Sequence, residues 1–292
     1  MTSAPPVMMG MKLPDIDQWS ERVIVALGQN PSVFAGPGTN TYLVGTGPER
    51  ILLDPGGGET AYIPFLEQAL ERGACRIQEI VLTHGHPDHI GGVRQVIERF
   101  GELEVKKQPW PMMDETHHVE ITPIEDGSVI HTEGATLRAL HTPGHAPDHL
   151  CFILEEERSL FSGDNILGVG TTVIPAESGN LGDYMASLER LLEEEPTRIY
   201  PAHGPCIEQG TAKIREYIDH RLERNRQILD ALDQGAALPM EIVEIVYAAY
   251  PKVLHPAAAQ SVVSHLLHLE AREEVARNND EPSPHAARWR RR

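Results

Sequence analysis

Three histidines and an aspartate are concentrated in one short segment, Thr83-His84-Gly85-His86-Pro87-Asp88-His89. The largely apolar run 79–82 precedes it, so the sequence predicts a buried strand that ends in a polar loop. His84 and His86 can reach one point, while the two ligand-type side chains after the proline can serve a second point nearby. Neutral imidazole and carboxylate are ligands of zinc and similar divalent metals. This density after a strand favours a metal site over a solvated polar loop.

Three further segments place a ligand-type residue just beyond a predicted strand. His145 follows the strand 137–141, Asp164 follows the strand 160–161 and His203 follows the strand 198–200. Strand ends at one edge of a layered α/β protein form a shared crevice, which is where ligand sites are found. Each residue alone has an ordinary explanation, such as a turn histidine or a helix cap. Together with the histidine-rich loop they predict a single site.

The remaining sequence alternates strand and helix signals up to about residue 208 and is mainly helical after it. We expect strands near 22–27, 40–44, 50–54, 80–82, 129–131, 136–141, 150–154, 159–161 and 198–200, and helices over 59–72, 91–100, 182–194, 211–234, 239–250 and 256–276. Residues 103–120 are expected to be irregular because Pro109 and Pro111 interrupt them. The chain thus divides into an unstructured lead-in (1–19), a strand-rich catalytic domain (20–208), a small helical domain (209–277) and a mobile basic tail (278–292).

The chain of 292 residues has a formal net charge of −18 and three widely spaced cysteines. The odd cysteine count predicts a reducing compartment rather than a disulfide framework. No run approaches the roughly 20 apolar residues that span a bilayer, and the N-terminus lacks the apolar segment of a secretory signal. We therefore expect a cytoplasmic protein without a membrane-spanning helix, or one of the mitochondrial matrix if the source is eukaryotic. The oligomeric state, a dimer included, stays open.

The order of the motifs, HxHxDH, then TPGH, then GD, then PxHG, resembles the metallo-β-lactamase superfamily between residues 20 and 205. The resemblance implies an α/β fold of the αββα sandwich type with a binuclear metal site. It also implies a ligand set: His84, His86 and His145 at one ion, Asp88, His89 and His203 at the other, and Asp164 shared by both.

Two Zn²⁺ ions are the expected cofactors, and Mn²⁺ or iron would suit the same nitrogen and oxygen ligands. Two neighbouring cations must share anionic ligands, here the Asp164 carboxylate and a solvent-derived hydroxide. Their charge lowers the pKa of that water toward ~7 and provides a nucleophile at neutral pH. We therefore count Asp88 and Asp164 as catalytic residues as well as ligands.

Several other residues near these motifs are weaker candidates. Asp148 and His149 lie close to the TPGH motif, but the predicted site is already filled, so we expect structural or supporting roles for them. Cys206 follows the last motif, yet a carboxylate already takes the bridging position. His117 and His118 lie in the irregular stretch and are expected to be solvated.

A closer resemblance, covering nearly the whole chain, is to the beta-lactamase-like protein 2 subfamily. It is carried by the segments 38–45, 133–138, 162–168 and 218–221. It implies a winged-helix-like C-terminal domain that packs over the site, and an endoribonuclease activity on single-stranded RNA. Fungal polyketide thioesterases share the same segments. The segment 174–180, just beyond the GD motif, differs from the sequences of the animal members of this subfamily. Its position predicts that it alters the edge of the site where substrate binds.

Three functions follow as hypotheses. The main expectation, from the subfamily, is phosphodiester hydrolysis in single-stranded RNA, with Arg221 and the basic tail holding phosphates. The alternative is hydrolysis of a small thioester or ester, as in glyoxalase II or the fungal thioesterases. The acidic net charge and an aromatic fraction of only 5% favour this alternative. The third hypothesis is a non-enzymatic metal-binding interaction module, which would keep the ligands without a catalytic water.

Overall fold

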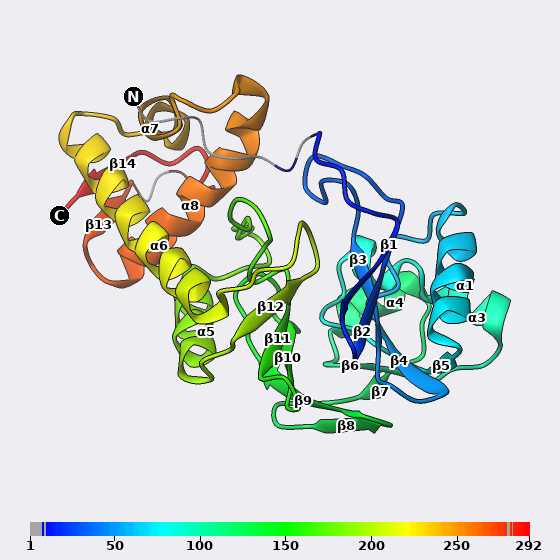
Figure 1. The fold of residues 1–292 in the computed structure, drawn as a ribbon. Helices are drawn as coiled ribbons and strands as arrows, with labels where there is room; N and C mark the ends of the chain where they lie inside the picture. The colour runs from blue at the N-terminus through cyan, green and yellow to red at the C-terminus, as the bar shows by residue number, and fades with distance from the viewer. Residues whose placement is uncertain (1–7, 9, 279–280, 282) are drawn as a thin grey trace.

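The structure is a computed structural model that describes residue 8 and residues 10–278, 281 and 283–292. Two mixed β-sheets pack face to face, and helices cover both outer faces of the pair (Figure 1). This arrangement is the αββα sandwich expected from the sequence, and a mainly helical unit follows it. Every helix in the described part of the chain is too short or too polar to traverse a bilayer.

The first sheet contains seven strands in the order β1 to β7. They are β1 (Ile16–Ser20), β2 (Val23–Leu27), β3 (Asn40–Val44), β4 (Glu49–Leu53), β5 (Arg76–Val81), β6 (Val105–Lys107) and β7 (Thr122–Pro123). Strands β1 to β4 pair antiparallel, and β4 to β7 pair parallel. Strands β2 and β3 are buried throughout because the second sheet covers one face and helices cover the other.

The second sheet contains five strands in the order β12-β11-β10-β9-β8. They are β8 (Val129–Thr132), β9 (Ala135–His141), β10 (Leu150–Leu154), β11 (Ser159–Gly163) and β12 (Arg198–Pro201). Only β11 and β12 pair parallel, and the crossover between them contains helix α5 (Leu181–Glu193). Asn180 caps this helix, since its side-chain oxygen accepts hydrogen bonds from the backbone of Gly182 and Asp183.

The helices of the sandwich pack through separate apolar cores on the two outer faces. They are α1 (Tyr62–Gly73), α2 (Pro87–Ile90), α3 (Val93–Phe100), α4 (Pro111–His117), α5 and the first half of α6 (Gly210–Asp233). Helices α1 and α3 cover the first sheet through residues such as Leu66 and Val96. Helices α5 and α6 cover the second sheet through residues such as Leu188 and Ile214. The core between the sheets is apolar and aromatic and includes Phe161.

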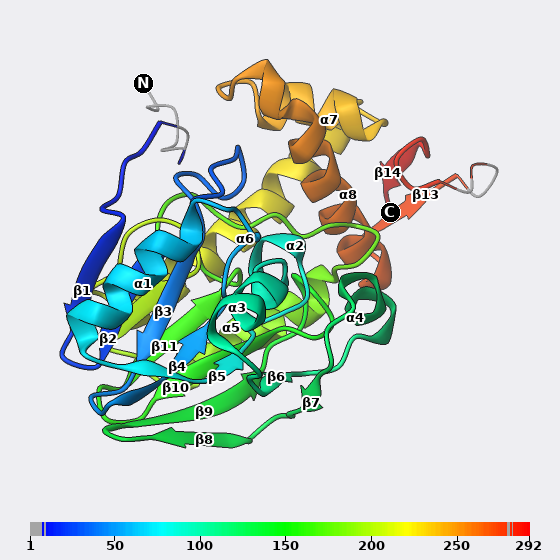
Figure 2. The same ribbon diagram turned by 90° about the vertical axis from the view of Figure 1, so that its right-hand side faces the viewer.

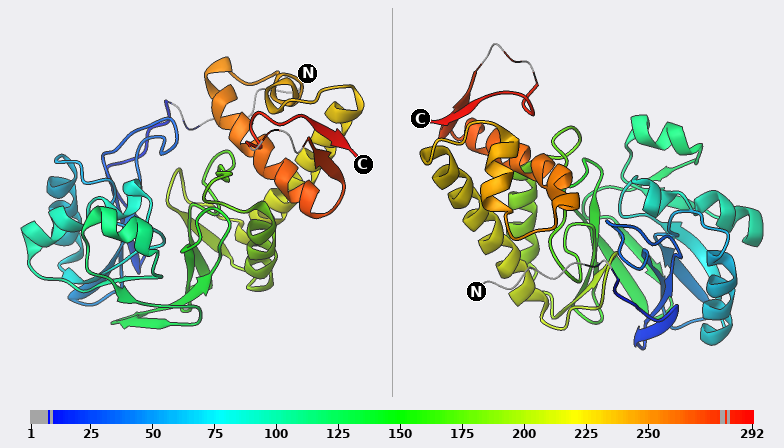
Figure 3. Two further views of the ribbon diagram at one scale, coloured as in Figure 1. Left: turned by 180° about the vertical axis from the view of Figure 1, so that it is seen from behind. Right: turned by 90° about the horizontal axis from the view of Figure 1, so that it is seen from above.

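The C-terminal unit packs against the second half of α6, which therefore belongs to both parts of the molecule (Figures 2 and 3). It consists of α7 (Pro239–Val246), a 3₁₀ turn (Lys252–Leu254), α8 (His255–Ala271) and the antiparallel pair β13 (Val275–Arg277) and β14 (Trp289–Arg291). Two helices after α6, followed by a two-stranded ribbon, match the winged-helix-like domain expected there. The helices α7 and α8 end earlier than the sequence predicts.

The expectation of a mobile basic tail over residues 278–292 is wrong for residues 289–291. These residues form β14, and the indole of Trp289 is only 2% exposed within the C-terminal core. The backbone N–H of Trp289 donates to the carbonyl of Ala237 at 2.7 Å, and its indole N–H donates to the carbonyl of Pro284 at 3.1 Å. One buried aromatic side chain orders the arginine-rich segment around it.

Two other segments are also more regular than expected. Residues 16–19 belong to the edge strand β1, although the sequence predicts an unstructured lead-in over 1–19; residues 1–7 and 9 lie outside the described residues. Helix α4 lies inside the stretch 103–120 that was expected to be irregular. Pro111 occupies its first turn, where the missing N–H of proline has no partner to lose, so this proline begins a helix.

Candidate active site at the strand ends

All seven residues predicted to form the site lie at one edge of the two sheets. The first sheet contributes the loop after β5 and the short helix α2, which together carry His84, His86, Asp88 and His89. The second sheet contributes one residue from each of three loops. His145 lies beyond β9, Asp164 directly follows β11, and His203 lies just beyond β12, after Ala202. The structure thus brings residues from distant parts of the sequence, from His84 to His203, to one site.

One group consists of three histidines whose ring nitrogens converge. His84 Nε2 lies 2.9 Å from His86 Nδ1, and His145 Nε2 lies 3.0 Å from the same His86 nitrogen. Burial lowers the pKa of His84 well below its usual value and lowers the pKa of His86 to about 4. Both rings are therefore neutral at neutral pH, which is the form that ligates a metal ion.

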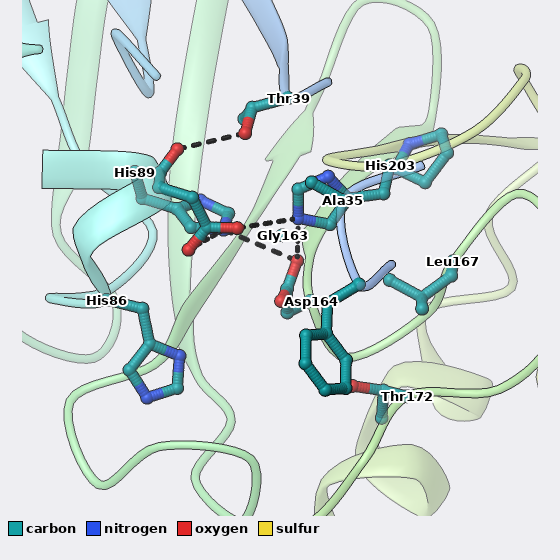
Figure 4. A network of polar contacts seen from close by, with 12 residues as sticks. Ala35, Thr39, His86, His89, Gly163, Asp164, Leu167, Thr172 and His203 are labelled. Carbon is teal, nitrogen blue, oxygen red and sulfur yellow. Dashed lines mark hydrogen bonds and ion pairs between the residues drawn. The ribbon is translucent and has the colours of Figure 1, made fainter. Parts of the chain in front are cut away.

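A second group combines two histidines with a carboxylate. His203 Nε2 lies 3.4 Å from Asp88 Oδ2, and His89 Nε2 lies 3.9 Å from Asp88 Oδ1. The backbone carbonyl of Asp88 accepts a hydrogen bond from the hydroxyl of Thr39 at 2.9 Å, which ties this loop to the start of β3 (Figure 4). The ligand atoms within each of these two groups lie within 4.8 Å of one another.

Asp164 contacts both groups, and Figure 4 shows its carboxylate beside His203 and His89. Its Oδ1 lies 3.1 Å from His203 Nε2 and 3.4 Å from His89 Nε2. Its Oδ2 lies 3.5 Å from His145 Nε2. A single carboxylate can therefore contact both groups at once, which is the geometry that a shared ligand requires.

The carboxylates of Asp88 and Asp164 make the environment of the site favourable for positive charge. Burial by itself disfavours the charged form of Asp164, but His203 and His89 lower its pKa well below the usual value. Burial also opposes the charge on His203, yet Asp164 and then Asp88 raise the pKa of His203 to about 9. The buried atoms Asp164 Oδ1 and His89 Nε2 face one another at 3.4 Å, but neither forms a hydrogen bond. Buried nitrogen and oxygen atoms that converge in this way fit divalent cations with N/O ligands.

Two neighbouring residues hold the ligand-type side chains in place. The Asp54 carboxylate lies 2.9 Å from His89 Nδ1 and accepts hydrogen bonds from the backbone and the hydroxyl of Thr83. The Nε2 atom of His149 accepts a hydrogen bond from the backbone N–H of Asp164 at 3.1 Å. A supporting role was expected for His149. Asp54 was expected only as the last residue of the strand 50–54, although it follows the end of β4 as the ligand loop follows the end of β5.

The loop that follows Asp164 positions His145. The carbonyl of Val173 lies 2.9 Å from His145 Nδ1, and the hydroxyl of Thr172 lies 3.3 Å from the same atom. Two helices hold this loop from outside. Arg221 of α6 donates to the carbonyl of Thr172 at 2.6 Å, and Ser264 of α8 donates to the carbonyl of Ile174 at 2.6 Å. The predicted segment 174–180 therefore begins in direct contact with the C-terminal unit.

Four other candidates lie outside the two groups. Asp148 binds the buried Lys107 ammonium at 2.6 Å, in agreement with a structural role. Cys206 contacts Glu208 rather than the cluster. His117 and His118 lie at the end of α4. Among the described residues, none of these four belongs to a group that could hold a metal ion.

The seven residues of the site (His84, His86, Asp88, His89, His145, Asp164 and His203) form what we call the His/Asp cluster. A cavity of about 1160 Å³ leads from this cluster to the C-terminal unit. Its walls include the loop 29–35, the loop 167–175, one face of α6 and the start of α8. Phe34, at its edge, is 62% exposed. The cavity is large enough for a substrate of coenzyme size and opens onto both polar and apolar wall residues.

Comparison with known proteins places the chain in a family. Residues 35–203 match the model of the metallo-beta-lactamase superfamily, and residues 239–289 match that of the beta-lactamase associated winged helix domain. A lactamase-like protein, adaB, of Aspergillus niger is 46% identical over 77% of this chain and 68% of its own. An atrochrysone carboxyl ACP thioesterase of Claviceps purpurea is 43% identical over 76% and 68%. A beta-lactamase-like protein 2 homolog of Caenorhabditis elegans is 42% identical over 85% and 83%.

Solved structures agree with this placement. A metallo-beta-lactamase family protein of Thermus thermophilus superposes with a TM-score of 0.70 at 26% identity, over 87% of this chain and 94% of its own. A protein named TTHA1623, solved in a di-iron-bound form, has a TM-score of 0.50 at 30% identity, over 59% and 91%. With two family models matched in order, the fold, and the His/Asp clusters at the strand ends, this chain belongs to the metallo-beta-lactamase superfamily and carries its associated winged helix domain.

Proposed function

We propose that this metal-dependent hydrolase cleaves thioesters, using the His/Asp cluster at the strand ends. The observation that carries the proposal is the cavity, which joins the cluster to a partly apolar wall formed by the loops 29–35 and 167–175. Such a wall suits an acyl chain beside a carbonyl that reaches Asp164. Relatives of 43%, 39% and 41% identity bear the name atrochrysone carboxyl ACP thioesterase, which supports the same chemistry.

The ligand assignment is part of this proposal. One divalent cation is held by His84, His86 and His145, the other by Asp88, His89 and His203, with Asp164 shared between them. When bound, two such cations lower the pKa of water toward ~7 and polarise a carbonyl oxygen. Zn²⁺ is the expected metal; Mn²⁺ and iron suit the same ligands, and the relative named TTHA1623 binds two iron ions.

The protein's own groups keep this site in one geometry. Asp54 orients the ring of His89, and the loop 172–173 orients the ring of His145. His149 fixes the backbone of Asp164, so the shared carboxylate stays between the two groups. Such supporting contacts set the direction of ligand atoms and are worth about 10- to 100-fold in metal affinity or activity.

Hydrolysis of single-stranded RNA is the second candidate, and the structure offers it less support. Arg221 lies at the inner wall of the cavity rather than on the outer surface, and Arg291 of the basic tail pairs with Asp233, so neither belongs to an exposed basic track. A polyanion needs an exposed basic track with stacking platforms, against a net charge here of −18. Membership of the family and the groups of His and Asp side chains that could hold metal ions support an enzyme, so the hypothesis of a non-enzymatic module is set aside.

The proposed location is cytoplasmic, which the three free cysteines support. The test of function is a side-by-side assay of the zinc-loaded protein with an acyl-coenzyme A, an S-acyl glutathione and a labelled single-stranded RNA, each with and without chelator. We expect chelator-sensitive hydrolysis of a thioester. Cleavage of the RNA alone would refute the proposal and restore the ribonuclease hypothesis.

A further inference from the structure

Two buried arginines of α6, Arg221 and Arg224, line the same cavity as the His/Asp cluster. Their exposed fractions are 2% and 6%. Arginine is almost never this buried unless a partner balances its charge. Among the described residues, no carboxylate oxygen lies within the 4.0 Å that defines an ion pair for either guanidinium. The two positive charges therefore face the cavity without a counter-ion from the protein.

The contacts of the two guanidinium groups are all with neutral partners. Arg221 donates to the carbonyl of Thr172 at 2.6 Å and lies 5.0 Å from the ring centre of Tyr184. Arg224 donates to the side chain of Gln227 at 3.0 Å and to the carbonyl of Val246 at 3.3 Å, and it stacks 4.1 Å above the ring of Tyr247. The buried Nε atoms of both arginines have no hydrogen-bond partner. A guanidinium has five N–H donors, so both groups keep donors to spare.

His220 and His265 lie beside these arginines, in an environment of positive electrostatic potential. The pKa of His220 is lowered to about 4, by burial first and then by the charges of Arg221 and Arg224. The same causes lower the pKa of His265 well below its usual value. Glu216 also lines the cavity, but Lys213 neutralises it at 2.8 Å. This positive region contrasts with the net charge of −18 of the whole chain.

The arginines lie close to the reacting end of the cavity. Thr172 accepts a hydrogen bond from Arg221 through its carbonyl, while its hydroxyl lies 3.3 Å from His145 Nδ1. Arg224 follows three residues later, about 4.5 Å further along the helix axis toward the C-terminal unit. A substrate whose carbonyl reaches the His/Asp cluster would thus extend its remaining part along the face of α6.

We propose that Arg221 and Arg224 form a subsite for one oxyanion, a phosphate or a carboxylate, on the thiol carrier of the substrate. The inference rests on the proposed thioester hydrolysis and names its substrate class: thioesters of anionic carriers rather than of neutral thiols. The planar fork of arginine binds both oxyanions in a bidentate manner. Two donors buried at the wall of a cavity hold a single anionic group; they do not form a track for a nucleic-acid backbone.

The test compares one acyl group on three carriers: coenzyme A with its phosphates, glutathione with its carboxylates, and the neutral N-acetylcysteamine. In Arg224→Gln, the preference in kcat/KM for an anionic over the neutral carrier falls about tenfold or more, mainly through KM, because hydrogen bonds between charged groups are of that size. A fall with coenzyme A only identifies phosphate, and a fall with glutathione only identifies carboxylate. An unchanged preference for both carriers overturns the subsite.

Matched variants separate the subsite from general effects. Arg226→Gln removes an exposed arginine of the same helix that pairs with Glu223 and Asp230, and it keeps the wild-type preference. Arg224→Lys keeps the charge but loses the planar fork, so its preference lies between those of wild type and Arg224→Gln. An equal loss of preference in Arg226→Gln would assign the effect to overall charge and refute the subsite.

A binding measurement distinguishes failure of the subsite from failure of the proposed function. Calorimetry with inorganic phosphate on the metal-loaded protein should show weaker binding in Arg224→Gln than in wild type. If this holds while no thioester is hydrolysed, the subsite stands and the proposed function fails. If thioesters are hydrolysed while phosphate binding and carrier preference are unchanged, the function stands and the subsite fails.

A wild-type experiment covers a variant that does not fold. Inorganic phosphate should raise the KM for the acyl-coenzyme A more than the KM for the neutral thioester. Equal inhibition of both substrates would place the phosphate at the metal cluster and overturn the subsite.

Discussion

Two clusters of ionisable groups beside the cavity differ in the sign of their charge. In the His/Asp cluster, the carboxylates raise the pKa of His203 to about 9. In the Arg/His cluster of α6 and α8, which comprises His220, Arg221, Arg224 and His265, the pKa of His220 is lowered to about 4. Burial lowers the pKa of His220 as it lowers that of His86 to about 4, and the arginines lower the pKa of His220 further. The pKa rises only where a histidine faces carboxylates directly, as at His203. Carboxylates beside histidines therefore favour a cation site, whereas arginines beside them favour an anion site.

The strongest test of this contrast removes the shared carboxylate. In Asp164→Ala, kcat/KM should fall about 10³-fold or more, because the contact that serves both ligand groups is lost and metal assistance contributes several kcal/mol. Elemental analysis should find fewer than two metal ions per chain. Asp148→Asn, a buried aspartate outside the clusters, serves as the control and keeps its metal. Full activity in Asp164→Ala would contradict the role of this residue.

The next prediction concerns the apolar core of the C-terminal unit, which supports the Arg/His cluster and lies apart from the His/Asp cluster. Trp289→Ala empties a buried indole site in the C-terminal core and should lower the free energy of unfolding by about 3–5 kcal/mol. Chemical denaturation measures the loss, with the exposed Arg290→Ala as a neighbouring control. The folded fraction should keep its metal content. A change below about 1 kcal/mol would show that the tail is not part of the folded core.

A smaller effect, on metal affinity, is expected from a change at Asp54, which supports His89 of the His/Asp cluster. Asp54→Asn removes the negative charge that faces His89 Nδ1 and should weaken metal binding by about 10- to 100-fold. Asn tolerates the positive φ of 52° at this position, so the backbone stays in place. Competition with a chelator gives the affinity, and Asp15→Asn on the surface is the comparison. Wild-type affinity in Asp54→Asn would mean that the metal orients His89 unaided.

The smallest effect concerns the pH dependence of stability in the Arg/His cluster. Since the pKa of His220 in the folded protein is lowered to about 4, the unfolded chain takes up the proton first as the pH falls. The contribution of neutral His220 to the free energy of unfolding is therefore complete above about pH 6.5, and it is lost as the pH falls from about 6.5 to 4. In His220→Asn, the total loss of unfolding free energy between these two pH values should be smaller than in wild type by on the order of 2 kcal/mol. Urea unfolding across the range measures it; a parallel slope in the variant would contradict the shift.

Local spacing in the sequence was sufficient for part of the site. The HxHxDH loop and the strand before it lie within eleven residues, so their pattern alone predicts that the side chains converge. His145, Asp164 and His203 became predictable only as a set in a fixed order, because each comes from a different loop. Their common location at one sheet edge follows from the sandwich, and the resemblance to a known family supplied it.

What could not be predicted depends on contacts between distant segments. Pro111 begins α4 instead of interrupting it, and only its partners in space decide between these outcomes. Trp289 is surrounded by arginines in sequence but lies in the core of the C-terminal unit. Arg221 was expected to hold phosphates of single-stranded RNA, yet it lies on the buried face of α6 at the wall of the cavity. In each case the chemical type of the residue was clear from the sequence, and its environment was not.

Helix α6 has a consequence for how such proteins can be recombined. Its first half packs on the second sheet, its second half packs in the C-terminal unit, and its middle holds Thr172 next to His145. A chimera joined before residue 210 would exchange the winged helix domain together with the clamp on a ligand histidine. Carrier preference and catalytic alignment would then be inherited as one trait, so new substrate preferences in this architecture are expected to arise by substitutions along α6 more readily than by exchange of domains.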